Sequence, residues 1–317
     1  MRIQFILTAT CVYPSIRSLA FLLRDLGHEV HVLFEHKNQE DVDVPCEQAA
    51  WSAFDFRPIE AFKPDRIVIW NGHFPPIFAA YEHIRRRWVT RVIELAWLPQ
   101  RGHVYLAETL AQRSVLGKVG YIPGATRRYQ ELLEELRARF APRPVGDDLG
   151  DFVLVPAQLE HDTSFQFSPH FKTIDSFVGY LKHELPEAAI IVKNHPLEKD
   201  RRRDCPVYAG EARFVDLAAK ATMVLGLNST ALLETLVLQK PVLAYAESPG
   251  RLGFLRPQRI QQLWHAARQG ERLIDPDWMD FRAVVLALNQ FPMDDPPRWA
   301  ADKILDEHYF PNVPRSF

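Results

Sequence analysis

The sequence has few cysteines and no large excess of charge of either sign. Its three cysteines, Cys11, Cys46 and Cys205, form no CxxC pair, which excludes a disulfide framework and favours reduced thiols in a cytoplasmic protein. Lys and Arg number 38 against 40 Asp and Glu, which gives a net charge of −2. Proteins that coat DNA or RNA usually carry a strong basic excess, so we expect no nucleic-acid partner.

Long hydrophobic runs are also missing. No apolar stretch reaches the ~20 residues that a membrane-spanning helix needs. The apolar part of the N-terminus before Thr8 is shorter than the core of a signal peptide, so we predict a buried strand there and a cytoplasmic protein. Basic residues at Arg85–Arg87 and Arg127–Arg128 leave peripheral association with the inner membrane open, although solvated helix faces explain them equally well.

Several catalytic motifs are absent as well. The sequence contains no Walker A loop, no HExxH, no GxSxG and no cluster of Cys and His with metal-ligand spacing. Asp41-Val42-Asp43 resembles the DxD motif of metal-dependent sugar transferases, but its polar loop favours solvated carboxylates. We therefore predict no metal site.

The composition that remains is that of a globular protein, with 47% hydrophobic and 25% charged residues. Short apolar runs and helical segments alternate along the chain, which is typical of parallel sheets with right-handed crossovers. The predicted strands are Ile3–Leu7, Val30–Phe34, Arg66–Trp70, Val92–Ile93, Phe152–Val155, Ala189–Val192, Met223–Leu225 and Val242–Tyr245. The predicted helices are a segment capped by Ser15 or Ser18 and ending at Leu26, Thr126–Arg139, Thr173–Glu184, Phe214–Lys220 and Thr230–Leu238.

The length of 317 residues suggests two domains, and the Pro- and Gly-bracketed segment Ala141–Gly150 is the best linker candidate. We predict one domain over residues 1–145 and a second over 146–296. Residues 297–317 are predicted to hold a helix that crosses back to the first domain. Two α/β units without a GxGxxG indicate two Rossmann-like domains facing a cleft, the GT-B type of architecture, with ligands at the carboxyl ends of the strands.

Polar side chains follow two predicted strands of the second half. Gln158 and Asp162 lie four residues apart just after Phe152–Val155, which is more than a helix cap requires. Lys193 and His195 end the next strand, where Pro196 stops it. Two donors at a strand tip suit a phosphate or carboxylate, although a solvated loop explains them as well.

A third strand of this half leads directly into a helix. Asn228, Ser229 and Thr230 stand where backbone amides at a helix start favour an anion, and Glu234 one turn later is placed for the hydroxyls of a ribose. A plain capped helix is the simpler explanation of each residue alone. Three strand ends with such groups in one domain together favour nucleotide binding.

The first half offers a carboxylate at a strand end. Glu94 follows Val92–Ile93 and precedes an apolar segment that raises the pKa of a carboxyl group, which suits a general acid or base. A surface glutamate is the alternative. We also place Arg101, His103 and Tyr105 along an acceptor site.

Together these residues resemble the bacterial retaining β-Kdo transferases of capsule and lipopolysaccharide biosynthesis. The resemblance rests on four elements between about Ile93 and Ala244. They are QxxxD at Gln158…Asp162, HP at His195-Pro196, NST…E at Asn228…Glu234, and the segment ELAWLPQ that begins at Glu94.

The resemblance implies a GT-B enzyme that moves Kdo from CMP-β-Kdo to an oligosaccharide or lipid-linked glycan, with no metal and no cofactor besides the donor. It implies an acceptor-side first domain and a CMP-binding second domain. Asp162 would attack the anomeric carbon of Kdo, and Glu94 would act as acid and base. The donor would bind to Gln158, Lys193, His195, Asn228, Ser229, Thr230 and Glu234.

Two other functions fit the same residues. The protein could use a different donor, a CMP-sialic-acid-like or UDP-linked sugar, because the phosphate-binding elements serve several nucleotides. It could also be a non-catalytic nucleotide- or glycan-binding subunit of a polysaccharide assembly complex. Retention by double displacement needs two carboxyl groups about 5–5.5 Å apart, so an enzyme would have to close its cleft to bring Asp162 and Glu94 together.

Overall fold

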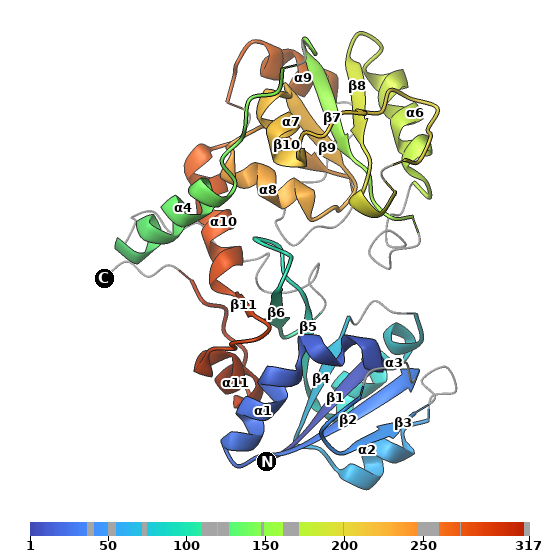
Figure 1. Cartoon of the computed structure of the whole chain (residues 1–317), viewed down its shortest axis with the longest axis vertical. Helices are drawn as coiled ribbons and strands as arrows, with labels where there is room; N and C mark the ends of the chain where they lie inside the picture. Colours follow the sequence, from blue (N-terminus) through green and yellow to red (C-terminus); the bar gives the residue numbers. More distant parts are fainter. Residues whose placement is uncertain are drawn as a thin grey trace. The chain divides into compact units, whose positions relative to one another are not determined.

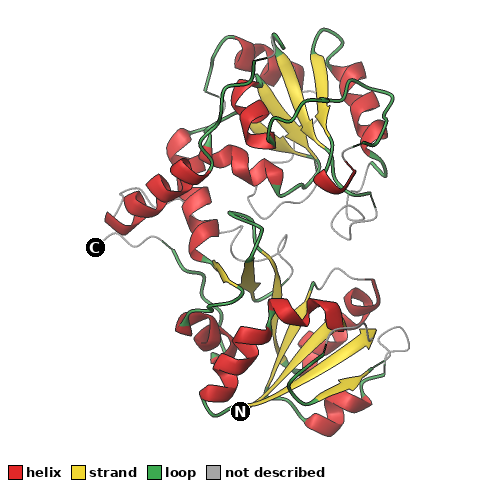
Figure 2. Ribbon diagram, viewed as in Figure 1, coloured by secondary structure: helices red, strands yellow, loops and turns green. Residues whose placement is uncertain are grey.

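The computed structural model describes residues 1–36, 41–49, 55–71, 75–109, 119, 127–146, 149–160, 171–198, 200–245, 260–272 and 274–313. The chain divides into two compact units (Figure 1). The first unit is Met1–Leu116 with Leu288–Asn312, and the second unit is Gly117–Ala287 with Val313–Phe317. Strands and helices alternate in both (Figure 2).

The first unit is built on a seven-stranded sheet of order β11-β6-β5-β4-β1-β2-β3. The strands from β5 to β3 in this order are parallel, whereas β6 pairs antiparallel with both β5 and β11. The strands are β1 (Arg2–Ala9), β2 (Glu29–His36), β3 (Cys46–Gln48), β4 (Arg66–Trp70), β5 (Val89–Leu95), β6 (His103–Ala107) and β11 (Gln290–Pro292). Its helices are α1 (Arg17–Asp25), α2 (Arg57–Phe62), α3 (Pro75–Arg87) and α11 (Arg298–Leu305), with a 3₁₀ helix at Thr10–Ser15.

Alternating side chains of the first unit's strands fill a core on each face of the sheet. On β1, Phe5 packs in one cluster with Leu23 of α1 and Ile304 of α11. Ile6 points to the other face and packs with residues such as Ile84 of α3. The return of residues 288–312 therefore supplies part of the first unit's core.

The second unit has a four-stranded parallel sheet of order β10-β9-β7-β8. Its strands are β7 (Phe152–Pro156), β8 (Ala189–Lys193), β9 (Met223–Gly226) and β10 (Val242–Ala244). Its helices are α4 (Arg127–Arg139), α6 (Ile174–Glu184), α7 (Phe214–Lys220), α8 (Ala231–Val237), α9 (Ile260–Arg268) and α10 (Pro276–Leu288), with a 3₁₀ helix at Pro196–Glu198. Residues of α6 and α9 pack with β7, β8 and β9 in one buried cluster, while α7 and α8 contact β7, β9 and β10.

The structure confirms the α/β class and each of the eight predicted strands, but it differs in several details. The predicted cap of the first helix at Ser15 or Ser18 is wrong, because a 3₁₀ helix runs directly into α1 and Ile16 occupies the N-cap without a side-chain bond. The helix predicted within residues 297–317 spans only Arg298–Leu305, because the backbone becomes extended at Asp306.

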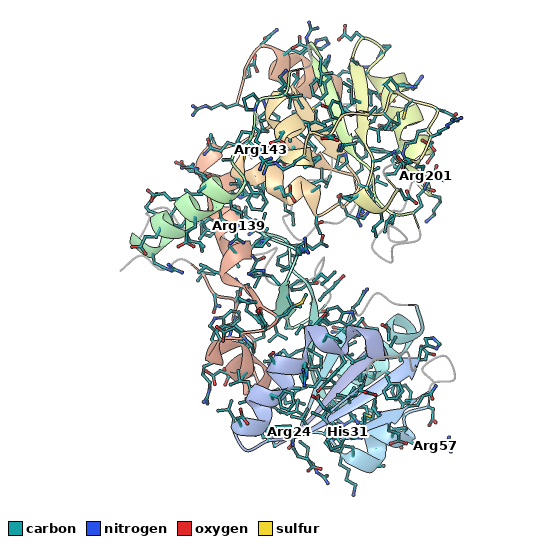
Figure 3. All side chains as sticks on the ribbon, in the orientation of Figure 1. Arg24, His31, Arg57, Arg139, Arg143 and Arg201 are labelled. Carbon is teal, nitrogen blue, oxygen red and sulfur yellow. The ribbon has the colours of Figure 1, made fainter. Side chains whose placement is uncertain are left out.

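The position of α4 also differs from the prediction, which placed this helix at the end of the first domain. An ion pair of 2.7 Å joins Arg137 of α4 to Asp280 of α10, and α4 contacts α8. The predicted linker is tied to the same unit, since the backbone N–H of Arg143, a residue labelled in Figure 3, donates to Asp216 of α7 at 2.8 Å. The contacts therefore group residues 117–145 with the second unit and return the chain to the first unit at Leu288 rather than at residue 297.

Candidate functional site

The carboxyl ends of three neighbouring parallel strands form one edge of the second unit's sheet. The segments after β7, β8 and β9 begin at Ala157, Asn194 and Leu227, and the strand order places β7 between the other two. Seven of the predicted site residues lie on these segments or immediately beside them. We call this edge the polar edge, and its seven residues are Gln158, Lys193, His195, Asn228, Ser229, Thr230 and Glu234.

Two predicted residues at the polar edge bind each other. Gln158 Nε2 donates to Asn228 Oδ1 at 2.8 Å, and the backbone N–H of Asn228 donates to Gln158 Oε1 at 3.2 Å. Both side chains are buried, with 6% and 7% exposed. Because a buried amide must have its partners, this pair fixes the spacing of the loops after β7 and β9.

Lys193 and His195 extend from the end of β8. Lys193 Nζ donates to the carbonyl oxygen of Gly210 at 3.2 Å and lies 5.1 Å from the ring centre of Tyr208. Partial burial lowers its pKa. His195 Nδ1 accepts the N–H of Leu197 at 3.2 Å, so the neutral ring carries its proton on Nε2.

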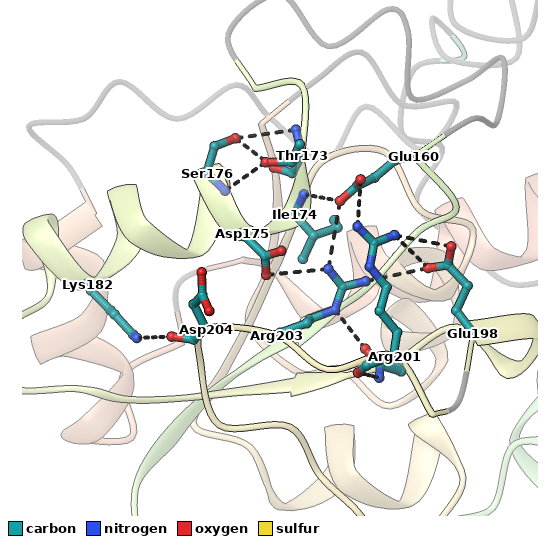
Figure 4. A network of polar contacts seen from close by, with 11 residues as sticks. Glu160, Thr173, Ile174, Asp175, Ser176, Lys182, Glu198, Arg201, Arg203 and Asp204 are labelled. Carbon is teal, nitrogen blue, oxygen red and sulfur yellow. Dashed lines mark hydrogen bonds and ion pairs between the residues drawn. The ribbon is translucent and has the colours of Figure 1, made fainter.

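Arg203 anchors the loop that carries these two residues, and sequence reasoning missed it. Its side chain is fully buried and lies 3.8 Å from Glu160, 3.5 Å from Asp175 and 3.7 Å from Glu198 (Figure 4). Its Nε donates to Asn194 Oδ1 at 2.8 Å. The loops after β7 and β8 and the first turn of α6 are thereby joined through one buried guanidinium.

Arg201 completes this network from the same segment. It donates to Glu160 at 2.8 Å and to Glu198 at 3.1 Å, while its carbonyl oxygen accepts from the Asn194 amide at 2.7 Å. Burial of Glu160 raises its pKa, but hydrogen bonds from Arg201 and the Ile174 N–H outweigh burial and leave the pKa below its usual value. Glu160 is therefore ionised and held two residues before the predicted nucleophile.

The segment after β9 leads directly into α8, as predicted, but only one of its hydroxyl groups binds a backbone amide of the helix start. Ser229 Oγ accepts the N–H of Ala231 at 3.3 Å, whereas Thr230 occupies the N-cap of α8 without a capping hydrogen bond from its side chain. The helix has only seven residues, so we assign no anion site to its dipole alone.

Glu234 lies in the first turn of α8. Unlike Glu160 and Glu198, which are paired with Arg201, it has no described arginine bound to its carboxyl group. Burial raises its pKa to about 7, against a smaller lowering effect from Arg213. It makes no hydrogen bond or ion pair with any residue that the structure describes. A half-buried carboxyl group with this pKa is a candidate ligand for hydroxyl groups.

Glu94 of the first unit has a defined partner. It lies inside β5, directly opposite Tyr105 on β6, and its Oε2 accepts the Tyr105 hydroxyl at 2.9 Å. The Tyr105 ring is buried and stacks on Trp97 with 4.0 Å between ring centres, and burial followed by the Glu94 charge raises the pKa of Tyr105 well above its usual value. Tyr105 is thus placed to orient Glu94.

Arg101 is exposed in the turn before β6, where its carbonyl oxygen accepts from His103 Nδ1 at 3.2 Å.

Asp162 lies outside the described residues, so its predicted role stays a prediction.

Within the ranges given above, no group of three or more His, Cys, Asp or Glu is arranged to hold a metal ion. Asp43 of the DxD-like sequence is instead engaged by Tyr13 and Arg17. No helix in the described part of the chain is both long and apolar enough to span a bilayer.

The buried network yields a stability prediction. Arg203→Met removes a cation from Glu160, Asp175 and Glu198 and the Nε donor from buried Asn194 Oδ1, and losing the partner of a buried polar group costs about 1–3 kcal/mol. Arg202→Met is the matched control, because Arg202 is exposed and its loss is expected to change stability by less than about 0.5 kcal/mol. Urea unfolding of both variants measures the difference, and equal effects would show that Arg203 does not hold the loops.

Comparison with known proteins adds the family. The family model of capsule polysaccharide biosynthesis proteins matches residues 112–284. No curated protein matches the chain.

Two solved structures from Thermosulfurimonas dismutans share the fold. One is KpsC, beta Kdo 2,7 transferase, with 15% identity, a TM-score of 0.59 and 92% of each chain covered. The other is KpsC, beta Kdo 2,4 transferase, with 15% identity and a TM-score of 0.50 over 88% of this chain and 97% of that one. These similarities support the GT-B type of fold. Because the family model covers more than half of the sequence, the chain belongs to the capsule polysaccharide biosynthesis protein family.

Proposed function

We propose that this protein is a glycosyltransferase that transfers Kdo from CMP-β-Kdo to a glycan or lipid-linked acceptor, with retention of the β configuration. The family, the fold that it shares with two β-Kdo transferases and the sequence elements around Glu94 and Asp162 support the proposal. The observation that carries it is the polar edge, where a buried amide pair, the ammonium group of Lys193, the imidazole of His195 and one half-buried carboxyl group follow neighbouring strands.

The polar edge is suited to a nucleotide with one phosphate. Lys193 and the Nε2–H of His195 supply donors for the phosphate or for the Kdo carboxylate. Glu234 accepts hydrogen bonds from the ribose hydroxyls. The pair of Gln158 and Asn228 holds the loops after β7 and β9 at a fixed separation, and Ser229 with Thr230 begins the helix that carries Glu234.

The reaction needs two carboxyl groups with different tasks. The Asp162 carboxylate attacks the anomeric carbon of Kdo, and CMP leaves with the electrons of the bond that breaks. The acceptor hydroxyl then displaces Asp162 from the same carbon while Glu94 removes the hydroxyl proton. Tyr105 keeps Glu94 in one orientation during this step.

The donor nucleotide is tested by calorimetric titration of the full chain with CMP, with UDP as the matched control. We expect CMP to bind and UDP to bind at least about tenfold more weakly, a difference of about 1.4 kcal/mol. Tighter binding of UDP would replace the proposed donor with a UDP-sugar. Absence of binding by CMP, UDP and CMP-Kdo would overturn the proposed activity.

The nucleophile is tested separately from donor binding. Asp162→Asn should reduce Kdo transfer by about 10³-fold or more, as loss of a covalent nucleophile does, and leave the CMP dissociation constant within about threefold. Asp204→Asn is the control, because Asp204 is exposed and lies on the same unit. Transfer at near wild-type rate by Asp162→Asn would exclude double displacement through this residue.

The pKa of Glu234 predicts how nucleotide binding depends on pH. A carboxylate accepts ribose hydroxyls better than a carboxylic acid does, so affinity should rise as pH increases through about 7. Ionisation rises from about 10% at pH 6 to about 90% at pH 8, which predicts about a tenfold gain in CMP affinity. The phosphate of CMP also titrates in this range, so the gain is compared with that of Glu234→Gln. An identical pH profile in this variant would exclude Glu234 from the nucleotide site.

A further inference from the structure

The second unit has a hollow at the edge of its sheet opposite to the polar edge. Asp151, Thr222 and Pro241 line it, and each comes immediately before a strand, β7, β9 or β10. Because these strands are parallel, their amino ends share one edge and their carboxyl ends the other. The hollow measures about 390 Å³, within the range of sites that hold small ligands.

Its charged lining is mostly basic. Four cationic side chains and two acidic ones contribute, namely Lys220, Lys240, Arg268, Arg272, Asp151 and Glu271. Asp151 is already engaged, since Arg268 lies 3.1 Å from its Oδ2 and the Thr222 hydroxyl donates to its Oδ1 at 3.4 Å. The cations therefore outnumber the carboxylates available to them.

Among these four cations, Lys240 is the one that is withdrawn from water, whereas Lys220, Arg268 and Arg272 are exposed. It is half-buried, and burial lowers its pKa. It makes no hydrogen bond or ion pair with its side chain to any residue in the described ranges. Holding an ammonium group partly out of water without a partner costs free energy, which a bound anion would recover.

Capping of α8 does not explain this lysine. Cations often follow helix ends because they satisfy the last carbonyl groups. Here, however, the backbone N–H of Lys240 donates to the carbonyl oxygen of Thr235 at 3.3 Å, and that of Gln239 to Leu236 at 3.0 Å. Gln239 adopts the left-handed conformation, with φ of 53°, that this arrangement requires. The backbone thus closes the helix by a Schellman motif and leaves the ammonium group available.

We propose that this hollow binds a sugar-sized anion, a molecule with a phosphate or carboxylate group that Lys240 receives. The volume accommodates a monosaccharide ring with its charged substituent. Lys240 supplies the charge-assisted hydrogen bond that makes the site selective for an anion over a neutral sugar. The site is separate from the polar edge, so it does not depend on the proposed Kdo transfer.

The test is calorimetric titration of the full chain with glucose 1-phosphate and with glucuronate, using glucose as the neutral probe. We expect at least one anionic probe to bind, glucose not to bind, and saturating CMP to leave the binding unchanged. Lys240→Gln should weaken the anion at least about tenfold, while Lys240→Arg, which keeps the charge, should stay within about threefold.

Lys182→Gln is the matched control, because Lys182 is an exposed lysine on α6 of the same unit. Far-UV circular dichroism of each variant verifies that it is folded. Failure of both anions to bind would overturn the proposal, as would equal affinities in Lys240→Gln and Lys182→Gln. Displacement of the anion by CMP would assign the binding to the polar edge instead and likewise overturn it.

Discussion

A single buried guanidinium organises the polar edge of the second unit. Arg203 is surrounded by three carboxylates and the Asn194 amide, which come from the loops after β7 and β8 and from the first turn of α6. A charge with no exposure to water tolerates few alternative arrangements, because each displaced partner leaves an uncompensated group in a medium of low dielectric constant. The network therefore joins two loops and one helix turn into a defined surface beside Lys193 and His195.

The environments of three glutamates show how the same side chain is adapted to different tasks. Glu160 is kept ionised by Arg201 and a backbone N–H, which suits an anchor. Glu94 accepts a buried phenol across a strand pair, which fixes its direction. Glu234 has neither kind of partner among the described residues and has a raised pKa, which leaves it available to a ligand. Partners and burial, rather than sequence position, separate the structural carboxylate from the two functional candidates.

Much of the fold was predictable because buried parallel strands appear as continuous apolar runs. Two of the three described strands that the prediction lacked give no such signal. Cys46–Gln48 is exposed throughout, and Gln290–Pro292 is three residues long and contains a proline. His103–Ala107 is apolar, but the prediction assigned its polar members to an acceptor site, whereas Tyr105 is a buried partner of Glu94. At the polar edge, the types of the site residues were predictable from their places after strands, but their pairing was not. Arg203 escaped notice because a run of arginines normally indicates a solvated surface, and only the tertiary contacts show which of the three is buried.

The two edges of the second sheet follow from one feature of α/β units, in which each helix returns the chain from the carboxyl edge to the amino edge. At the carboxyl edge, α8 begins beside a pair of buried amides and presents Glu234 in its first turn. At the amino edge, the same helix ends with its carbonyl groups satisfied by its own backbone. A helix closed in this way needs no cation, so the partial burial of Lys240 carries an energetic cost that no described residue offsets. A ligand offsets that cost without any change in the fold, and this is the physical reason to treat the amino edge as a second binding surface of the same unit.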